Sequence, residues 1–353
     1  MRRIALLDYA RFFAAMMVLV FHYWYDAIRH GKIFSISYTP VISTIAKAGY
    51  LGVEFFFMIS GYVIFFSANQ KTAVAFASAR AKRLYPAYWS ALILTTVVIL
   101  SWGEPSQTVT WRQFLGNLTM LQSRLGIEHI DVVYWTLHYE LAFYACITLI
   151  LLVGLQRKLP TIITFWPLAI LLVSWLDQWE VPVLTGYYSY FAAGALFAIR
   201  KEEKNNLNLL SLCLAFYCCC WFALGQPQWI DTEKWLLPGN MVIIAIITLF
   251  FVFFHFLNSP GWQQKDLPLA GLLGALSYPI YLLHNEIGVI LLNHWATDSN
   301  KWFVYLLVIA CIIALAFLVH KLVEKRMAGL WERFFRFVLA KPIAYLESKR
   351  FWI

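Results

Sequence analysis

Charged residues are scarce in this sequence. Asp, Glu, Lys and Arg together make up 13% of the 353 residues, whereas hydrophobic residues make up 61%. Soluble globular chains are roughly half apolar and a quarter charged. This composition, with a mean hydropathy of +0.66, therefore excludes an ordinary soluble domain. The sequence predicts an all-α, polytopic (multi-pass) membrane protein whose length is taken up by membrane-spanning helices.

The few cysteines do not form a ligand or disulfide pattern. All six fall within apolar segments, and no Cys-x2-Cys pair has a partner pair. A free cysteine in such a segment packs as a small hydrophobic side chain, so we expect no metal site. The sequence also lacks a glycine-rich phosphate loop, a nucleophile elbow and an extended repeat. These absences exclude the common classes of nucleotide-binding protein and serine hydrolase.

Apolar runs of about 17–25 residues are long enough to cross a bilayer as helices. The sequence holds ten of them, near residues 6–26, 48–68, 84–102, 134–154, 161–176, 184–200, 207–225, 236–257, 272–295 and 302–323. The run 161–176 is short, and Pro279 is expected to break the ninth run. A further apolar stretch, 113–122, is too short to cross and is expected to be interfacial or re-entrant.

Lys and Arg are distributed unequally between the two sides of the predicted membrane. With the N-terminus in the cytoplasm, the inner segments hold 20 of the 28 and the outer segments hold 7, while Arg11 lies inside the first span. Cytoplasmic loops carry the excess of Lys and Arg in membrane proteins, so both termini are predicted to be cytoplasmic. This topology and anionic lipids account for the net charge of +9, and no nucleic-acid partner is expected.

Two domains are predicted along the chain. Residues 1–326 form the transmembrane domain, and residues 327–353 form a basic tail. In this tail Lys and Arg alternate with aromatic residues such as Trp331, Phe334 and Phe337. The pattern is typical of an amphipathic helix that lies on the inner leaflet, so we expect the tail to bind membrane lipids as an anchor.

Arg11 and His22 are two ionisable residues inside the first predicted span. Eleven residues are close to three helical turns, so both side chains lie on one face, about 16 Å apart along the axis. Ionisable groups in hydrocarbon are costly and by default mark a functional site that faces the protein interior. The alternative is that Arg11 snorkels to the headgroups while His22 lies near the opposite interface.

Other polar residues are embedded in later spans. Glu54 lies in the second span, His138 and Glu140 near the outer end of the fourth, and His284 and Glu286 in the ninth. A carboxylate inside a span requires a partner, so the glutamates are candidates for a site. His138 could equally belong to the belt of residues at the membrane–water interface. His284 could simply form a hydrogen bond across helices.

A basic group, Arg80, Lys82 and Arg83, lies between the second and third spans at the predicted cytoplasmic surface. Guanidinium groups pair well with phosphate oxygens, so this group is a candidate site for a phosphorylated ligand. The alternative is that these residues only anchor the loop on the inner side, because such loops are usually basic.

Together these segments resemble the acyltransferase-3 family of integral membrane acyltransferases, which includes enzymes that O-acetylate bacterial surface polysaccharides. Three motifs carry the similarity: the Arg-x10-His of Arg11 and His22, the Gly-Val-Glu block from Gly52 to Gly61, and the Arg-x-x-Arg of Arg80 and Arg83. The resemblance implies a protein of the bacterial inner membrane. It would transfer an acyl group, acetyl above all, to a hydroxyl of an extracytoplasmic polysaccharide, O-antigen or lipid-linked glycan.

The resemblance also implies a donor and a set of roles. Cytoplasmic acetyl-CoA or another acyl-CoA would be the donor, with Arg80 and Arg83 on its phosphates and Arg11 beside its pantetheine arm. His22 would be the general base, because an imidazole titrates near neutral pH. A covalent acyl-histidine relay remains open as the alternative. The sequence fixes neither the acyl chain, nor the acceptor, nor the oligomeric state.

A catalytic base needs an orienting partner, and three carboxylates compete for that position beside His22. Glu54 is favoured because it lies in a motif that carries the resemblance. Asp26 is the local alternative, one turn after the histidine, and Glu140 is the third candidate.

Two other classes of protein fit part of the pattern. Ten helices with buried Arg, His and Glu also suit a secondary transporter, whose coupling groups lie near the midplane. Transporters often contain inverted repeats, but Arg-x10-His and Arg-x-x-Arg each occur once, in the N-terminal half. A weaker alternative is the other major family of membrane-bound O-acyltransferases, which uses a buried histidine in a later helix.

Overall fold

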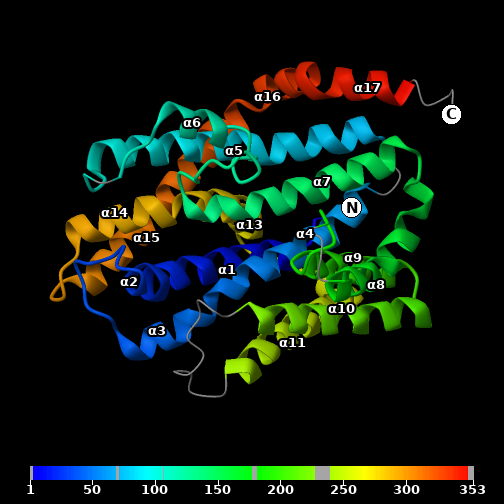
Figure 1. Cartoon of the computed structure of the whole chain (residues 1–353), viewed down its shortest axis with the longest axis horizontal. Helices are drawn as coiled ribbons and strands as arrows, with labels where there is room; N and C mark the ends of the chain where they lie inside the picture. The colour runs from blue at the N-terminus through cyan, green and yellow to red at the C-terminus, as the bar shows by residue number, and fades with distance from the viewer. Residues whose placement is uncertain (1–2, 69–70, 106, 177–180, 227–238, 349–353) are drawn as a thin grey trace.

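The computed structural model describes residues 3–68, 71–105, 107–176, 181–226 and 239–348. All regular secondary structure in these ranges is helical, which confirms the predicted all-α class. The longer helices are α1 (Ala5–Phe21), α4 (Gly52–Ala68), α5 (Ala73–Trp102), α7 (Leu137–Leu152), α8 (Leu159–Leu176), α9 (Tyr188–Glu202), α10 (Asn206–Gly225), α11 (Gly239–Leu257), α13 (Ala270–Leu283), α14 (Asn285–Trp295) and α15 (Lys301–Leu318). Figure 1 shows most of them side by side, along the longest axis of the molecule.

Short helices connect the long ones. They are α2 (Ala27–Arg29), α3 (Pro40–Ala46), α6 (Trp111–Asn117) and α12 (Pro260–Gln263), with α16 (Ala328–Phe335) and α17 (Lys341–Ser348) in the tail. The seven residues of α6 confirm that the apolar stretch 113–122 is too short to cross a membrane.

Eight of the described helices are long and apolar enough to span a membrane, or nine if the bent pair of α13 and α14 counts as one span. The chain is therefore a polytopic membrane protein. The prediction of ten full spans is too high by this measure, because the sixth falls on α9, which has only 15 residues. Every residue from Tyr188 to Ile199 is buried, so α9 is enclosed by its neighbours and need not present an apolar face to lipid. The start of the eighth predicted span, 236–238, lies outside the described residues.

The break in the ninth span lies at His284 and not at Pro279, where the sequence predicted it. Helix α13 continues through Pro279, and the bend of 68° separates it from α14. Asp131 explains the position of the bend, because its Oδ2 accepts a hydrogen bond of 3.0 Å from the backbone N–H of Glu286. A carboxylate at a helix start satisfies the free N–H groups of the first turn, so it stabilises a new helix from that point.

Helices α4 and α9 cross at two glycines. A Cβ atom on Gly61 would lie 2.0 Å from the Phe191 carbonyl oxygen, and one on Gly194 would lie 1.9 Å from that of Met58. Small residues allow two helix backbones to approach closely inside a membrane. This close approach fixes the position of α4 and hence of Glu54 on its first turn.

The tail is helical, as predicted, but it also packs on the protein. Figure 1 shows α16 and α17 lying along α5. Phe335 is buried and stacks on Trp89 with ring centroids 6.2 Å apart, and Lys82 Nζ lies 3.3 Å from Glu332 Oε2. The aromatic residues of the tail therefore contact α5, which the sequence did not predict. Its last residues, 349–353, lie outside the described part of the chain.

Candidate active site

Two adjoining cavities lie among the helices. The larger, which we call the His22 cavity, has a volume of about 790 Å³ and is lined by His22, Asp26 and Glu54 among others. The smaller, the Arg11 pocket, has a volume of about 90 Å³. Its charged lining residues are Arg11, Arg80, Arg83 and Glu140. Val53 and Tyr281 line both cavities and therefore separate them.

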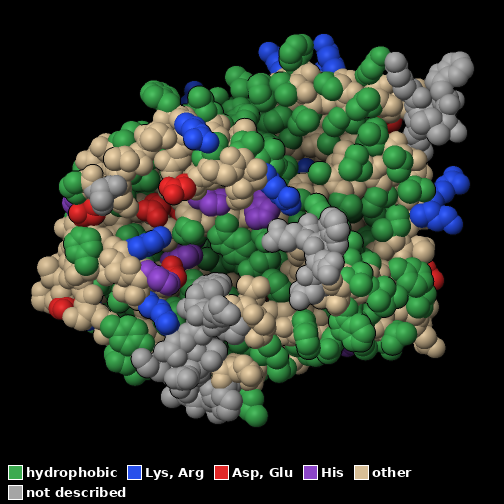
Figure 2. Space-filling view, viewed as in Figure 1, with side chains coloured by type: hydrophobic (Ala, Val, Ile, Leu, Met, Phe, Trp, Pro, Cys, Tyr) green, Lys and Arg blue, Asp and Glu red, His purple; other side chains and the backbone are tan. Residues whose placement is uncertain are grey.

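Arg11, on α1, lines the Arg11 pocket, and His22, directly after the end of α1, lines the His22 cavity. Arg11 and His22 both face the protein interior, as the three-turn spacing predicted, and His22 is 9% exposed. Arg11 Nη1 lies 3.6 Å from Asp8 Oδ1 one turn earlier. Figure 2 shows histidine, acidic and basic side chains gathered around a hollowed area of an otherwise largely apolar face. Asp8, Arg11 and His22 therefore lie in turn along the axis of α1 and its continuation.

His22 is hydrogen-bonded to a carboxylate of its own helix. Its Nδ1 lies 3.1 Å from Asp26 Oδ2, where α1 passes into a π-helical turn, His22–Asp26. Such turns occur frequently at functional sites. When Nδ1 donates to a carboxylate, Nε2 is the unprotonated nitrogen and can accept a proton. The structure therefore gives the orienting position beside His22 to Asp26, the local alternative, and not to the favoured Glu54.

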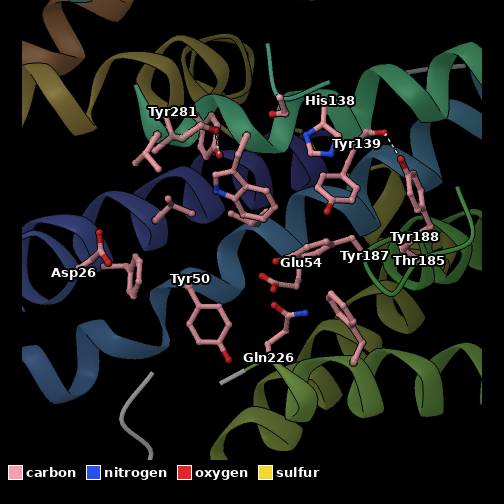
Figure 3. Close-up of a pocket in the computed structure, with 18 of the residues that line it drawn as sticks. Asp26, Tyr50, Glu54, His138, Tyr139, Thr185, Tyr187, Tyr188, Gln226 and Tyr281 are labelled. Carbon is pink, nitrogen blue, oxygen red and sulfur yellow. Dashed lines mark hydrogen bonds between the residues drawn. The ribbon is translucent and has the colours of Figure 1, made fainter. Parts of the chain in front are cut away.

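Glu54 points into the His22 cavity. Its side chain is 3% exposed, and among the described residues its Oε2 has no hydrogen-bond partner. Figure 3 shows Glu54 between Tyr139 and Gln226, and all three line this cavity. The carboxylate is thus placed to contact a molecule bound in this cavity.

Glu140 belongs to the other cavity. It lies in the first turn of α7 and accepts hydrogen bonds from the hydroxyls of Tyr144 and Ser60, the latter at 3.2 Å. The sequence placed Glu140 among the candidates to orient His22, whereas the structure separates the two residues into different cavities. This separation arises because the side chain of Glu140 points toward α4 and the arginines, a direction that sequence spacing does not reveal.

Arg80 and Arg83 both lie on α5 and line the Arg11 pocket, so the structure brings the two arginine motifs together. Arg83 Nη1 lies 3.6 Å from Glu324 Oε1, in the π-helical segment Val319–Arg326 that continues α15. The guanidinium of Arg80 lies 5.8 Å from the ring centroid of Tyr144, and its buried Nε has no partner among the described residues. The 3.6 Å ion pair of Arg83 and the unpartnered Nε of Arg80 leave N–H donors free for an anion such as phosphate.

His284 is a second histidine beside His22 that the sequence did not place in the site. The two imidazole rings have centroids 5.2 Å apart. His284 Nδ1 lies 2.7 Å from the carbonyl oxygen of Tyr281, and its buried Nε2 has no partner in the described part of the chain. Its position at the bend between α13 and α14 is a tertiary feature, because Asp131 from a distant loop sets that bend.

Comparison with known proteins agrees with this geometry. The profile of the family described as "Acyltransferase domain" matches residues 4–321, nearly the whole chain. The chain belongs to the acyltransferase-3 family. This acyltransferase-3 protein is therefore an O-acyltransferase of the membrane, and the transporter alternative is not supported.

Among the relatives of this acyltransferase-3 protein is the exopolysaccharide production protein ExoZ of Rhizobium meliloti, 27% identical over 67% of this chain and 75% of ExoZ. The acyltransferase MdmB of Streptomyces mycarofaciens is 29% identical over 44% of this chain and 41% of MdmB. The O-acetyltransferase OatA of Staphylococcus aureus is 23% identical over 79% of this chain and 52% of OatA. No solved structure matches the chain significantly.

Proposed function

We propose that this enzyme takes an acyl group, acetyl above all, from cytoplasmic acyl-CoA and transfers it to a hydroxyl of an extracytoplasmic glycan. A polysaccharide, an O-antigen or a lipid-linked saccharide would be the acceptor, in the bacterial inner membrane. One observation carries the proposal: an arginine-lined pocket and a histidine-carboxylate cavity adjoin along α1, and Val53 and Tyr281 line both. ExoZ and OatA, whose names refer to exopolysaccharide production and O-acetylation, support the acceptor class and the acetyl group.

The Arg11 pocket suits the donor. Its volume of about 90 Å³ suits a narrow chain such as the pantetheine arm rather than a nucleotide. The phosphates of acyl-CoA would then contact Arg80 and Arg83 at the mouth of the pocket, where the side chain of Arg83 is 36% exposed. Arg11 lies further along the route, on the helix that also holds His22, and would neutralise charge on the donor.

His22 suits the chemistry of transfer. Its Nε2 would accept the proton of the acceptor hydroxyl as the hydroxyl oxygen forms a bond to the thioester carbonyl carbon. The tetrahedral intermediate would then collapse, the carbon–sulfur bond would break, and the imidazolium would return the proton to the coenzyme A thiolate. Asp26 would hold the ring orientation and stabilise the imidazolium. In the alternative route, His22 would itself carry the acyl group as a covalent intermediate.

Sidedness of the donor provides the test. Membrane vesicles of both orientations, made from cells that express the enzyme, would receive radiolabelled acetyl-CoA on their outer face only. We expect glycan labelling in inside-out vesicles, where the donor meets the cytoplasmic face, and none in right-side-out vesicles. His22→Ala vesicles with equal amounts of protein are the control and should not be labelled. Equal labelling in both orientations would contradict the proposed donor route and the predicted topology.

A further inference from the structure

One wall of the His22 cavity is formed by aromatic rings in mutual contact. The ring centroids of Trp135 and Tyr187 are 5.1 Å apart, those of Tyr139 and Tyr187 are 4.8 Å apart, and those of Trp135 and Tyr139 are 5.7 Å apart. All three residues line the cavity, and they come from two separate segments of the chain. Such a wall offers broad, rigid apolar surface with polar groups at its edges.

Buried polar atoms face the same cavity without partners among the described residues. They include Oε2 of Glu54, on α4, and Oγ1 of Thr185, in the segment before α9. Buried polar groups are normally hydrogen-bonded, and leaving one unpaired is destabilising. Figure 3 shows Glu54, Tyr139, Thr185 and Tyr187 around one space. A molecule that binds here must combine apolar faces with several hydrogen-bonding groups.

The dimensions and chemistry of the cavity distinguish between ligand classes. Its volume of about 790 Å³ lies within the roughly 300–1,000 Å³ typical of ligand pockets, so more than a single hydroxyl group can enter. An acyl chain would fill the space but would leave Glu54 and Thr185 unpaired. A sugar presents hydrogen-bearing carbon faces to aromatic rings, and its hydroxyls can donate to a carboxylate and to a threonine oxygen.

We propose that this wall is the acceptor subsite and that it binds sugar rings, an inference that rests on the proposed function. Trp135, Tyr139 and Tyr187 pack against the faces of the ring, and Glu54 and Thr185 hydrogen-bond its hydroxyls. The ring is thereby oriented with another hydroxyl toward His22, which lines the same cavity. Glu54 is in this assignment a substrate-binding residue, and Asp26 keeps the orienting position beside the histidine.

Binding of sugars without any donor tests the subsite. The full chain would be placed in lipid nanodiscs, because maltoside detergents themselves present sugars. Saturation-transfer difference NMR would then be recorded with methyl glycosides of glucose, galactose, mannose and N-acetylglucosamine. We expect signals from ring protons with the wild-type protein, reduced about fivefold or more in Trp135→Ala and in Glu54→Gln. Trp135→Phe, which keeps an aromatic ring, should retain most of the signal.

Two controls separate this proposal from the catalytic one. Trp111→Ala removes a tryptophan that is 79% exposed and does not line the cavity, so its signals should equal those of the wild type. His22→Ala should keep sugar binding while acyl transfer is lost. No signal with any of the glycosides, or equal signals in wild type, Trp135→Ala and Glu54→Gln, would overturn the subsite. Neither result would contradict the proposed donor route, which the vesicle experiment tests separately.

Discussion

His22 Nδ1 and Asp26 Oδ2 lie 3.1 Å apart within a single π-helical turn at the end of α1. They are four positions apart in the sequence, so the pair needs no other helix to form. It gives the histidine a fixed ring orientation and makes Nε2 the nitrogen that can accept a proton. The dyad is the feature on which the chemical predictions depend.

The first prediction concerns this dyad. His22→Ala should lower kcat for acyl transfer by about 10²–10⁴-fold, because loss of a general base typically costs that much. Asp26→Asn should also lower kcat strongly, because the amide can no longer stabilise the imidazolium. Initial rates with labelled acetyl-CoA measure both. If Asp26→Asn leaves kcat unchanged while Glu54→Gln abolishes it, the orienting position returns to Glu54.

The second prediction concerns Arg11 on the same helix. Arg11→Lys keeps the charge but loses the planar fork, so activity should fall about tenfold or more, since hydrogen bonds to charged groups contribute roughly 1.5–3 kcal/mol. The measurement is kcat/KM for the donor in nanodiscs. Arg112→Lys, an exposed position on α6, is the matched control. Wild-type activity in Arg11→Lys would leave Arg11 with a structural role only.

The third prediction concerns the two arginines of α5. Arg80→Ala and Arg83→Ala should each raise the KM for acyl-CoA while saturating donor restores part of the turnover, because the histidine chemistry stays intact. Added salt should raise the wild-type KM in the same direction, since partly exposed charge pairs are screened. Arg112→Ala again serves as control. A fall in kcat with no change in KM would contradict the assignment of these residues to donor binding.

The fourth prediction concerns the crossing of α4 and α9. Gly194→Ala should destabilise the protein by at least about 1–3 kcal/mol, the usual cost of overpacking, because its new Cβ would lie 1.9 Å from a backbone oxygen. Thermal unfolding in detergent measures the effect. Gly329→Ala is the matched control, because a Cβ there would meet nothing within 4 Å. Equal melting temperatures for the two variants would show that the backbones of α4 and α9 do not approach each other this closely.

The fifth prediction concerns pH and the loop before α7. His129 Nδ1 lies 2.8 Å from Gln122 Nε2, and its Nε2 lies 2.9 Å from Ser123 Oγ. Burial lowers the pKa of His129 below its ordinary value, chiefly by desolvating the charged form. The unfolded loop then binds the proton more readily, so stability is full above about pH 6.5 and falls as the pH drops below that value.

Hydrogen exchange of residues 118–131 between pH 7.5 and pH 5 measures this fifth effect. Protection, after correction for intrinsic exchange rates, should decrease as the pH falls in the wild type. His129→Gln should lose most of that pH dependence, since the side chain no longer titrates. Ser123 and Arg124 of this loop line the His22 cavity, so a pH-dependent loop would also alter access to it. Unchanged protection between pH 7.5 and pH 5 would contradict the assignment of this pH dependence to His129.

Periodicity and hydropathy determined most of the fold in advance. Inside a bilayer the backbone N–H and C=O groups must be satisfied without water, and a continuous apolar run of about 20 residues achieves this as a helix. The same local geometry places Arg11 and His22 on one face of α1, and it places Asp26 within reach of His22. These relationships lie within one helix, and the sequence is sufficient to predict them or to include them among the alternatives.

Contacts between distant segments decided the rest. Glu140 points toward Arg11 and Tyr144 and away from His22, because α7 packs against α4 and α5, and no spacing rule encodes that direction. The bend that brings His284 beside His22 depends on Asp131, from a loop more than 150 residues earlier in the sequence. The aromatic wall combines Trp135 with Tyr187 in the same way. Such arrangements are set by which helices share a boundary, and only the packed structure contains that information.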